Sequence, residues 1–136
     1  MEIIVLVGIP GSGKTTLALS SYPKHHRVNL DRLHTRKKED KEISDSIAND
    51  RDIIIDNTNI TKRSRSKYIE TAKLFGITIK AIYLKCPLET ALARNASRQG
   101  KERIPDNAVR FYNKVLEPPS VEEGFDKVDE LVIGVA

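Results

Sequence analysis

The stretch Gly8-Ile9-Pro10-Gly11-Ser12-Gly13-Lys14-Thr15 matches the pattern G-x-x-x-x-G-K-[ST] at every fixed position. It follows the apolar run of residues 3–7 and opens a helical pattern, as a phosphate-binding loop between a strand and a helix requires. Its glycines let the backbone curl so that successive N–H groups point at phosphate oxygens, and the helix adds its N-terminal dipole. This stretch decides the fold, because it predicts a nucleotide site on a P-loop.

The chemistry of the loop residues predicts ATP and Mg²⁺ as the cofactors. Lys14 is expected to contact the β and γ phosphates as a point charge, and the Thr15 hydroxyl is expected to bind Mg²⁺. Together with Arg94 from a segment discussed below, the residues expected to bind the nucleotide are Gly8, Pro10, Gly11, Ser12, Gly13, Lys14, Thr15 and Thr16.

Short apolar runs that alternate with helical patterns predict an α/β fold. The chain has 136 residues, which suits one domain over residues 1–136. We expect a five-stranded parallel sheet with helices on both faces, which is a P-loop kinase fold with an arginine-bearing lid. The expected strands are residues 3–7, 53–55, 77–84, 131–133 and, more weakly, 28–30. The expected helices are residues 15–21, 39–49, 61–75, 88–98 and 106–116.

The charge of the chain is uneven. The net charge is +4, but residues 24–38, 62–67 and 94–103 together hold 14 Lys or Arg against two acids. A basic surface on an otherwise acidic body suits a polyanion, although three separate solvated faces would give the same composition. The single cysteine fits a reducing compartment, and no segment predicts a membrane span or a signal peptide. These features favour a cytoplasmic location.

The pattern around the loop favours a small phosphotransferase. A GTPase needs an N-K-x-D motif, which does not occur, and a large ATPase motor needs more chain than this. Asp31 follows residues 28–30 and is the candidate general base, with a helix cap or turn as the alternative role. Asp56 follows residues 53–55 and suits a carboxylate that acts on Mg²⁺, unless it only caps the next helix.

Two arginines are candidates for a lid over the phosphates. Arg94 and Arg98 are four residues apart on one predicted helix, just before a glycine-containing stretch. An arginine that stabilises a transferring phosphoryl group raises the rate by roughly 10³-fold or more. The alternative is an exposed basic helix end that complements the helix dipole.

The order of these motifs resembles the kinase domain of polynucleotide 5′-hydroxyl kinases. The resemblance rests on the loop, on Asp31 and the residues before it, on Asp56-Asn57-Thr58-Asn59 and on Arg94-Asn95-Ala96-Ser97-Arg98, and it extends to the tail at residues 117–125. The family transfers the γ-phosphate of ATP to the 5′-hydroxyl of DNA or RNA. The resemblance implies Asp31 as general base, Lys14 and Thr15 as ATP and Mg²⁺ contacts, and Arg98 as the lid arginine.

The resemblance also implies an acceptor site, in which this chain departs from the family at two positions. Leu30 stands where many family members carry an arginine, and His34 stands where some of them carry another. Arg32 or Arg36 are the candidates to replace the arginine that is missing at His34. The expected substrate-binding residues are Arg32, His34, Arg36, Asp56, Thr58 and Asn59, and the expected metal ligands are Thr15 and Asp56.

Two rival functions stay open at this point. The first is a small-molecule kinase of the same fold that acts on a sugar, antibiotic or nucleoside. The second is an ATP-binding regulatory protein without phosphotransfer. The sequence does not encode a phosphatase, because its Asp50-Arg51-Asp52 precedes a strand instead of ending one. A phosphatase or ligase would therefore be a separate partner.

Overall fold

The five strands form one sheet with the order β2-β3-β1-β4-β5, and every neighbouring pair is parallel. The computed structural model describes residues 1–134, apart from the side chain of Lys101. The strands are β1 (Glu2–Val7), β2 (His26–Val28), β3 (Ile53–Ile55), β4 (Thr78–Lys85) and β5 (Lys127–Val132). The predicted five-stranded parallel sheet is therefore confirmed.

Two strand boundaries predicted from the sequence are wrong. β2 ends at Val28, because the Asn29 side chain accepts a hydrogen bond from the backbone N–H of Arg32 at 3.0 Å and so caps a short helix, α2 (Leu30–Leu33). β5 begins at Lys127 instead of Leu131. It is an edge strand with mostly exposed or half-buried residues, so it lacks the continuous apolar run by which a central strand is found.

The longer helices agree with the sequence except at some of their ends. They are α1 (Lys14–Ser21), α3 (Arg36–Ala48), α4 (Lys62–Phe75), α5 (Leu88–Ala96) and α6 (Asp106–Val115), with single 3₁₀ turns at Gly100–Glu102 and Val121–Glu123. α3 begins before the predicted residue 39, because the Thr35 hydroxyl caps it. α5 ends at Ala96, so Arg98 lies in the turn after the helix. In the described residues, no helix is both long and apolar enough to cross a bilayer.

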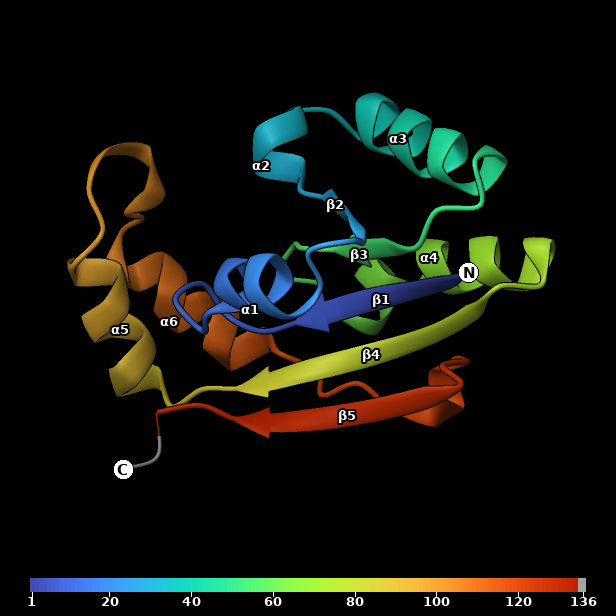
Figure 1. Cartoon of the computed structure of the whole chain (residues 1–136). Helices are drawn as coiled ribbons and strands as arrows, with labels where there is room; N and C mark the ends of the chain where they lie inside the picture. Colours follow the sequence, from blue (N-terminus) through green and yellow to red (C-terminus); the bar gives the residue numbers. More distant parts are fainter. Residues whose placement is uncertain (135–136) are drawn as a thin grey trace.

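The sheet is packed on both faces, with α1 on one and α3 and α4 on the other (Figure 1). Alternate residues of β1 supply the two cores: Ile3, Val5 and Val7 face α3 and α4, whereas Ile4 and Leu6 face Ala18 of α1. A third apolar cluster, built on Ile9, Ala91 and Val109, holds α5 and α6 together beside the loop. The carboxyl ends of the strands point to the side of the molecule where α5 and α6 lie (Figure 1).

Candidate active site

The loop between β1 and α1 has the backbone geometry of a phosphate cradle. Gly11 and Gly13 have φ values of 88° and 96°, in the left-handed region that favours glycine. A Cβ at Gly11 would lie 2.6 Å from the Ala91 carbonyl oxygen, and one at Gly8 would lie 2.6 Å from Ser12 Oγ. The fold therefore requires glycine at these positions, and α5 packs directly on the loop.

Lys14 lies folded over this loop. Its Nζ donates hydrogen bonds to the carbonyl oxygens of Gly8 and Ile9 at 2.9 and 3.0 Å. Burial lowers the pKa of Lys14 to about 8, although the Asp56 carboxylate acts in the opposite direction. Two further side chains act on the pKa of this amine: Arg98 lowers it and Asp31 raises it. The structure thus brings Lys14, Asp31 and Arg98 within electrostatic reach of one another.

Asp56 follows β3 and faces the first turn of α1. Its side chain is 1% exposed, and its Oδ2 accepts a hydrogen bond from Thr15 Oγ1 at 2.9 Å. The same oxygen accepts one from Arg27 Nε at 2.7 Å. Sequence reasoning did not single out Arg27, because the residue lies in β2, a strand that the sequence predicts only weakly and places at residues 28–30. The predicted metal ligands Thr15 and Asp56 therefore lie together, with a cation beside them.

Asp31 is exposed in α2, and two asparagines fix this short helix to the end of β3. Asn29 Nδ2 donates to the Asp56 carbonyl oxygen at 2.6 Å. Asn57 Oδ1 accepts a hydrogen bond from the Leu30 N–H at 2.8 Å. Asp31 thus projects from a helix and not from the end of a strand, but it still lies at the carboxyl edge of the sheet.

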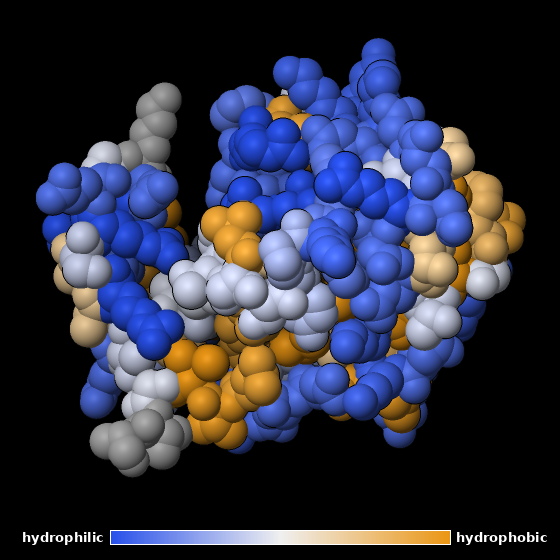
Figure 2. Space-filling model, in the orientation of Figure 1, coloured by the Kyte–Doolittle hydropathy of each residue, from blue (hydrophilic) through white to orange (hydrophobic). Residues whose placement is uncertain are grey.

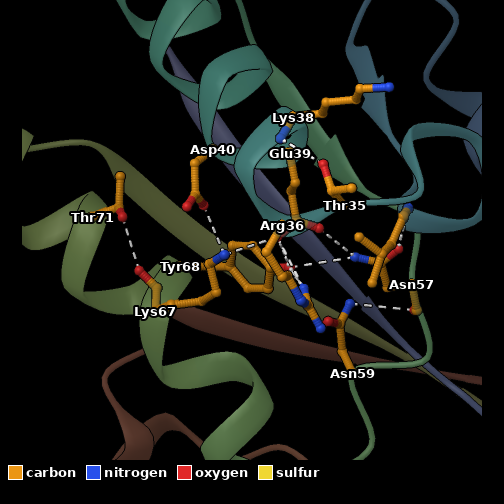
Figure 3. Close-up of polar contacts among 11 residues, drawn as sticks. Thr35, Arg36, Lys38, Glu39, Asp40, Asn57, Asn59, Lys67, Tyr68 and Thr71 are labelled. Atoms are coloured by element: carbon orange, nitrogen blue, oxygen red, sulfur yellow. Dashed lines mark hydrogen bonds and ion pairs between the residues drawn. The ribbon is translucent and has the colours of Figure 1, made fainter.

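A buried polar cluster supports Asn57 (Figure 3). The Glu39 side chain is fully buried, and it accepts hydrogen bonds from Asn57 Nδ2 at 3.0 Å, from Lys67 and Arg36 at 2.9 Å each, and from Tyr68. Burial acts to raise the pKa of Glu39, but Lys67 and Arg36 hold it below its usual value. Nothing in the sequence pattern distinguishes Glu39 from the other acids of α3, because its role depends on residues that are far away along the chain.

The arginine-bearing segment lies on the other side of the loop. Arg94 Nη1 donates to the Ser12 carbonyl oxygen at 3.3 Å. Asn95 is fully buried and forms two hydrogen bonds with the backbone of Ile104. Asn95 Nδ2 donates to the Ile104 carbonyl oxygen at 2.7 Å, and the Ile104 N–H donates to Asn95 Oδ1 at 3.1 Å. These bonds close the base of residues 97–103, the lid. Figure 2 shows an open notch between this lid and the part of the molecule that carries α2, with hydrophilic walls.

The predicted substrate-binding residues are dispersed. Arg32 pairs with Glu42 at 3.0 Å, and Arg36 pairs with Glu39. His34 is exposed and ends α2 with φ 70°. Thr58 accepts the Gly8 N–H at its backbone oxygen at 3.1 Å. Asn59 is buried and donates to the Leu6 carbonyl oxygen at 2.7 Å, so its side chain joins the core to the loop after β3.

Of the predicted nucleotide contacts, Pro10 is half-buried and Thr16 is exposed on α1.

Comparison with known sequences places this site in a family context. The AAA domain family model matches residues 41–119. The bifunctional polynucleotide phosphatase/kinase of Schizosaccharomyces pombe is 38% identical over 135 aligned positions, and the alignment covers 96% of this chain and 33% of that protein. The chain therefore spans about a third of this relative's length. The sequence resemblance to polynucleotide kinases is confirmed.

Comparison with solved structures shows the fold. A gluconokinase from Sinorhizobium meliloti aligns over 99% of this chain and 84% of its own, with a TM-score of 0.68 and 18% identity. Chaetomium thermophilum Kti12, in complex with ADP-AlF3, aligns over 96% of this chain and 88% of its own, with a TM-score of 0.71 and 20% identity. These likenesses confirm the predicted P-loop kinase fold. Since the family model matches more than half of its residues, the chain belongs to the AAA domain family.

Proposed function

We propose that residues 1–136 are a single kinase domain that transfers the γ-phosphate of ATP to the 5′-hydroxyl end of a nucleic acid. The observation that carries the proposal is the hydrogen bond of 2.9 Å from Thr15 Oγ1 to Asp56 Oδ2 beside the phosphate loop, at the edge of the sheet where Asn57 holds the helix of Asp31. Arg98 follows α5, the helix that packs on the same loop. The S. pombe relative's name supports a polynucleotide as the acceptor. The bound ADP-AlF3 of the Kti12 structure supports ATP as the donor.

The residues fit the proposed cofactors. The left-handed backbone at Gly11 and Gly13 lets the loop curl, which suits a cradle of N–H groups for phosphate oxygens. Thr15 Oγ1 and Asp56 Oδ2 are oxygen donors 2.9 Å apart, a set that suits Mg²⁺. When bound with ATP, this ion neutralises charge on the phosphates.

The proposed reaction is a direct displacement. The acceptor oxygen attacks the γ-phosphorus and forms the new O–P bond, the bond to the β,γ-bridging oxygen breaks, and ADP leaves. Asp31 accepts the hydroxyl proton, because its carboxylate is exposed in the helix that is held at the carboxyl end of β3. Lys14 and Arg98 stabilise the negative charge on the transferring group.

The experiment measures transfer of label from γ-labelled ATP to a 5′-hydroxyl oligonucleotide. Asp31→Asn is expected to lower the rate by about 10²- to 10⁴-fold, the usual contribution of a positioned general base. The matched control is Asp45→Asn, because Asp45 is exposed on α3 and pairs only with Lys41 among the described residues. Equal rates for Asp31→Asn and the wild type would contradict the role of Asp31.

A small hydroxyl compound is the second candidate acceptor, because the gluconokinase has the same fold. The same assay separates the two candidates when a polyol such as gluconate replaces the oligonucleotide. Label on the polyol, with none on DNA or RNA ends, would contradict the polynucleotide acceptor and keep the kinase. The cytoplasm remains the proposed location, on the argument from the single cysteine.

A further inference from the structure

The Arg27 guanidinium contacts both predicted metal ligands. Arg27 Nε donates to Asp56 Oδ2 at 2.7 Å, and Arg27 Nη2 lies 3.5 Å from Thr15 Oγ1. Asp56 Oδ2 also accepts the Thr15 hydroxyl. The two oxygens that suit a divalent cation therefore already contact a positively charged group of the chain, the Arg27 guanidinium.

The charges around Asp56 strengthen this point. Its side chain is 1% exposed, so water screens its interactions weakly. The neighbouring cations are Arg27, at contact distance, and Lys14, which precedes Thr15 and donates to the loop carbonyl oxygens of Gly8 and Ile9. One carboxylate thus faces two cations. A free divalent cation that enters this site meets net repulsion until the negative phosphates of a nucleotide arrive.

Arg27 is attached in a way that permits it to leave Asp56. It belongs to β2, an edge strand of three residues, and its side chain is 27% exposed. Among the described residues, its side chain forms hydrogen bonds only with Asp56 and Thr15. Rotation of this side chain into solvent therefore breaks no apolar packing in the two sheet cores, which do not include Arg27.

We propose that Arg27 occupies the divalent-cation position while the nucleotide is absent, so that the metal binds only together with the nucleotide. This inference rests on the proposed ATP and Mg²⁺ site, and it adds a positioning residue to that site. Arg27 keeps Asp56 and Thr15 in place before ATP binds, and its departure from Asp56 Oδ2 makes that oxygen available. The order of binding then follows from charge, without a change in the backbone.

The test measures Mn²⁺ binding to the nucleotide-free protein, with the electron paramagnetic resonance signal of free Mn²⁺ as the readout. Wild-type protein is expected to bind Mn²⁺ weakly, and Arg27→Gln is expected to bind it about tenfold or more tightly, because one neighbouring positive charge is gone. Addition of a non-hydrolysable ATP analogue is expected to reduce this difference. Equal Mn²⁺ affinity in the two nucleotide-free proteins would overturn the proposal.

Three further variants locate the effect. Arg51→Gln is the matched control, because Arg51 is an exposed arginine just before β3, at the opposite edge of the sheet, and it should leave Mn²⁺ affinity unchanged. Asp56→Asn in the Arg27→Gln protein should abolish the gained affinity, and tight binding that persists would contradict Asp56 as the ligand. If Arg27→Gln fails to fold, Arg27→Met replaces it, because methionine also removes the positive charge and keeps an aliphatic side chain at the position. Its Mn²⁺ affinity should rise in the same way, and an unchanged affinity in Arg27→Met would overturn the proposal.

The metal-binding result is independent of the acceptor. If the protein fails to phosphorylate oligonucleotides but Arg27→Gln gains Mn²⁺ affinity, the polynucleotide acceptor is wrong and the role of Arg27 stands. If oligonucleotides are phosphorylated and the two Mn²⁺ affinities are equal, the proposed function stands and Arg27 is a permanent brace between β2 and β3.

Discussion

Two segments of the chain have the same number of basic residues but different surroundings. Residues 62–67, the α4 segment, and residues 94–103, the lid segment, each contain four Lys or Arg. In the α4 segment, Arg65 is fully buried against Glu123 at 2.8 Å, and Lys67 pairs with Glu39 and Asp40. In the lid segment, Arg94 donates to the Ser12 carbonyl oxygen, and the charge of Arg98 helps to lower the pKa of Lys14. Acids from distant parts of the chain thus decide which cations are free to bind phosphate.

This difference bears on the basic surface that the sequence predicts. Arg65 joins α4 to residues 117–123, since it also donates to the carbonyl oxygens of Asn59 and Glu117 at 2.8 and 2.9 Å. The positive charge of Arg65 is therefore paired inside the fold and does not face solvent. A nucleic acid acceptor would therefore meet fewer cations along α4 than the sequence suggests.

The largest effect is expected from Arg65→Ala. This change leaves the Glu123 carboxylate, whose side chain is 7% exposed, without its partner. Breaking a buried ion pair from one side costs about 3–5 kcal/mol. Urea unfolding measures this loss, and Lys62→Ala, an exposed neighbour in α4, should change the free energy of unfolding by less than about 0.5 kcal/mol. Similar losses in the two variants would contradict the structural role of Arg65.

The opposite profile is expected from Arg98→Ala in the lid segment. It should leave the free energy of unfolding within about 0.5 kcal/mol of wild type, because the side chain is half-buried and no acid pairs with it in the described residues. Phosphate transfer should fall by roughly 10³-fold, the contribution of an arginine on the transferring group. Single-turnover transfer and urea unfolding on the same preparation separate the two effects. An unchanged rate would remove Arg98 from the active site.

A smaller effect is expected from Asn95→Ala, which removes the two bonds that hold Ile104. The part-buried backbone groups of Ile104 lose their partners at a cost of about 1–3 kcal/mol. Thermal unfolding measures this cost, and kcat/KM for transfer should fall by about tenfold because Arg98 is held less firmly. Asn49→Ala is the control, since the exposed Asn49 side chain bonds only the Asp45 carbonyl oxygen among the residues that the structure describes. Equal behaviour of the two variants would show that the lid needs no anchor.

A fourth effect concerns the pH dependence of stability. Because burial lowers the pKa of Lys14 from its usual value of 10.5 to about 8, the folded protein binds fewer protons than the unfolded chain between these pH values. The free energy of unfolding is therefore expected to rise, through this group, as the pH increases from about 8 towards 10.5. The wild type minus Lys14→Met difference isolates this rise from the titration of Cys86 and other groups. A flat difference curve between about pH 8 and pH 10 would contradict the lowered pKa.

The features that could be predicted from the sequence are local. The P-loop and the central strands follow from short patterns, and Asp56 falls at the end of β3 because strand and carboxylate are adjacent. The contacts that shape the site join distant residues: Arg27 and Asp56 are 29 residues apart, and Arg65 and Glu123 are 58 apart. No periodicity encodes such pairs. The short helix that carries Asp31 was not predicted, because Asn29, the residue that caps it, also fits the pattern of the strand predicted at residues 28–30.

The central claim is that this chain phosphorylates the 5′-hydroxyl end of a nucleic acid, and the most direct measurement maps the position of the transferred phosphate. Matched oligonucleotides with a 5′-hydroxyl or a 5′-phosphate are incubated with γ-labelled ATP, beside gluconate as a small acceptor. Label is expected only on the 5′-hydroxyl oligonucleotide, at its 5′ end. Label on gluconate alone, or on neither acceptor despite ATP binding, would contradict it.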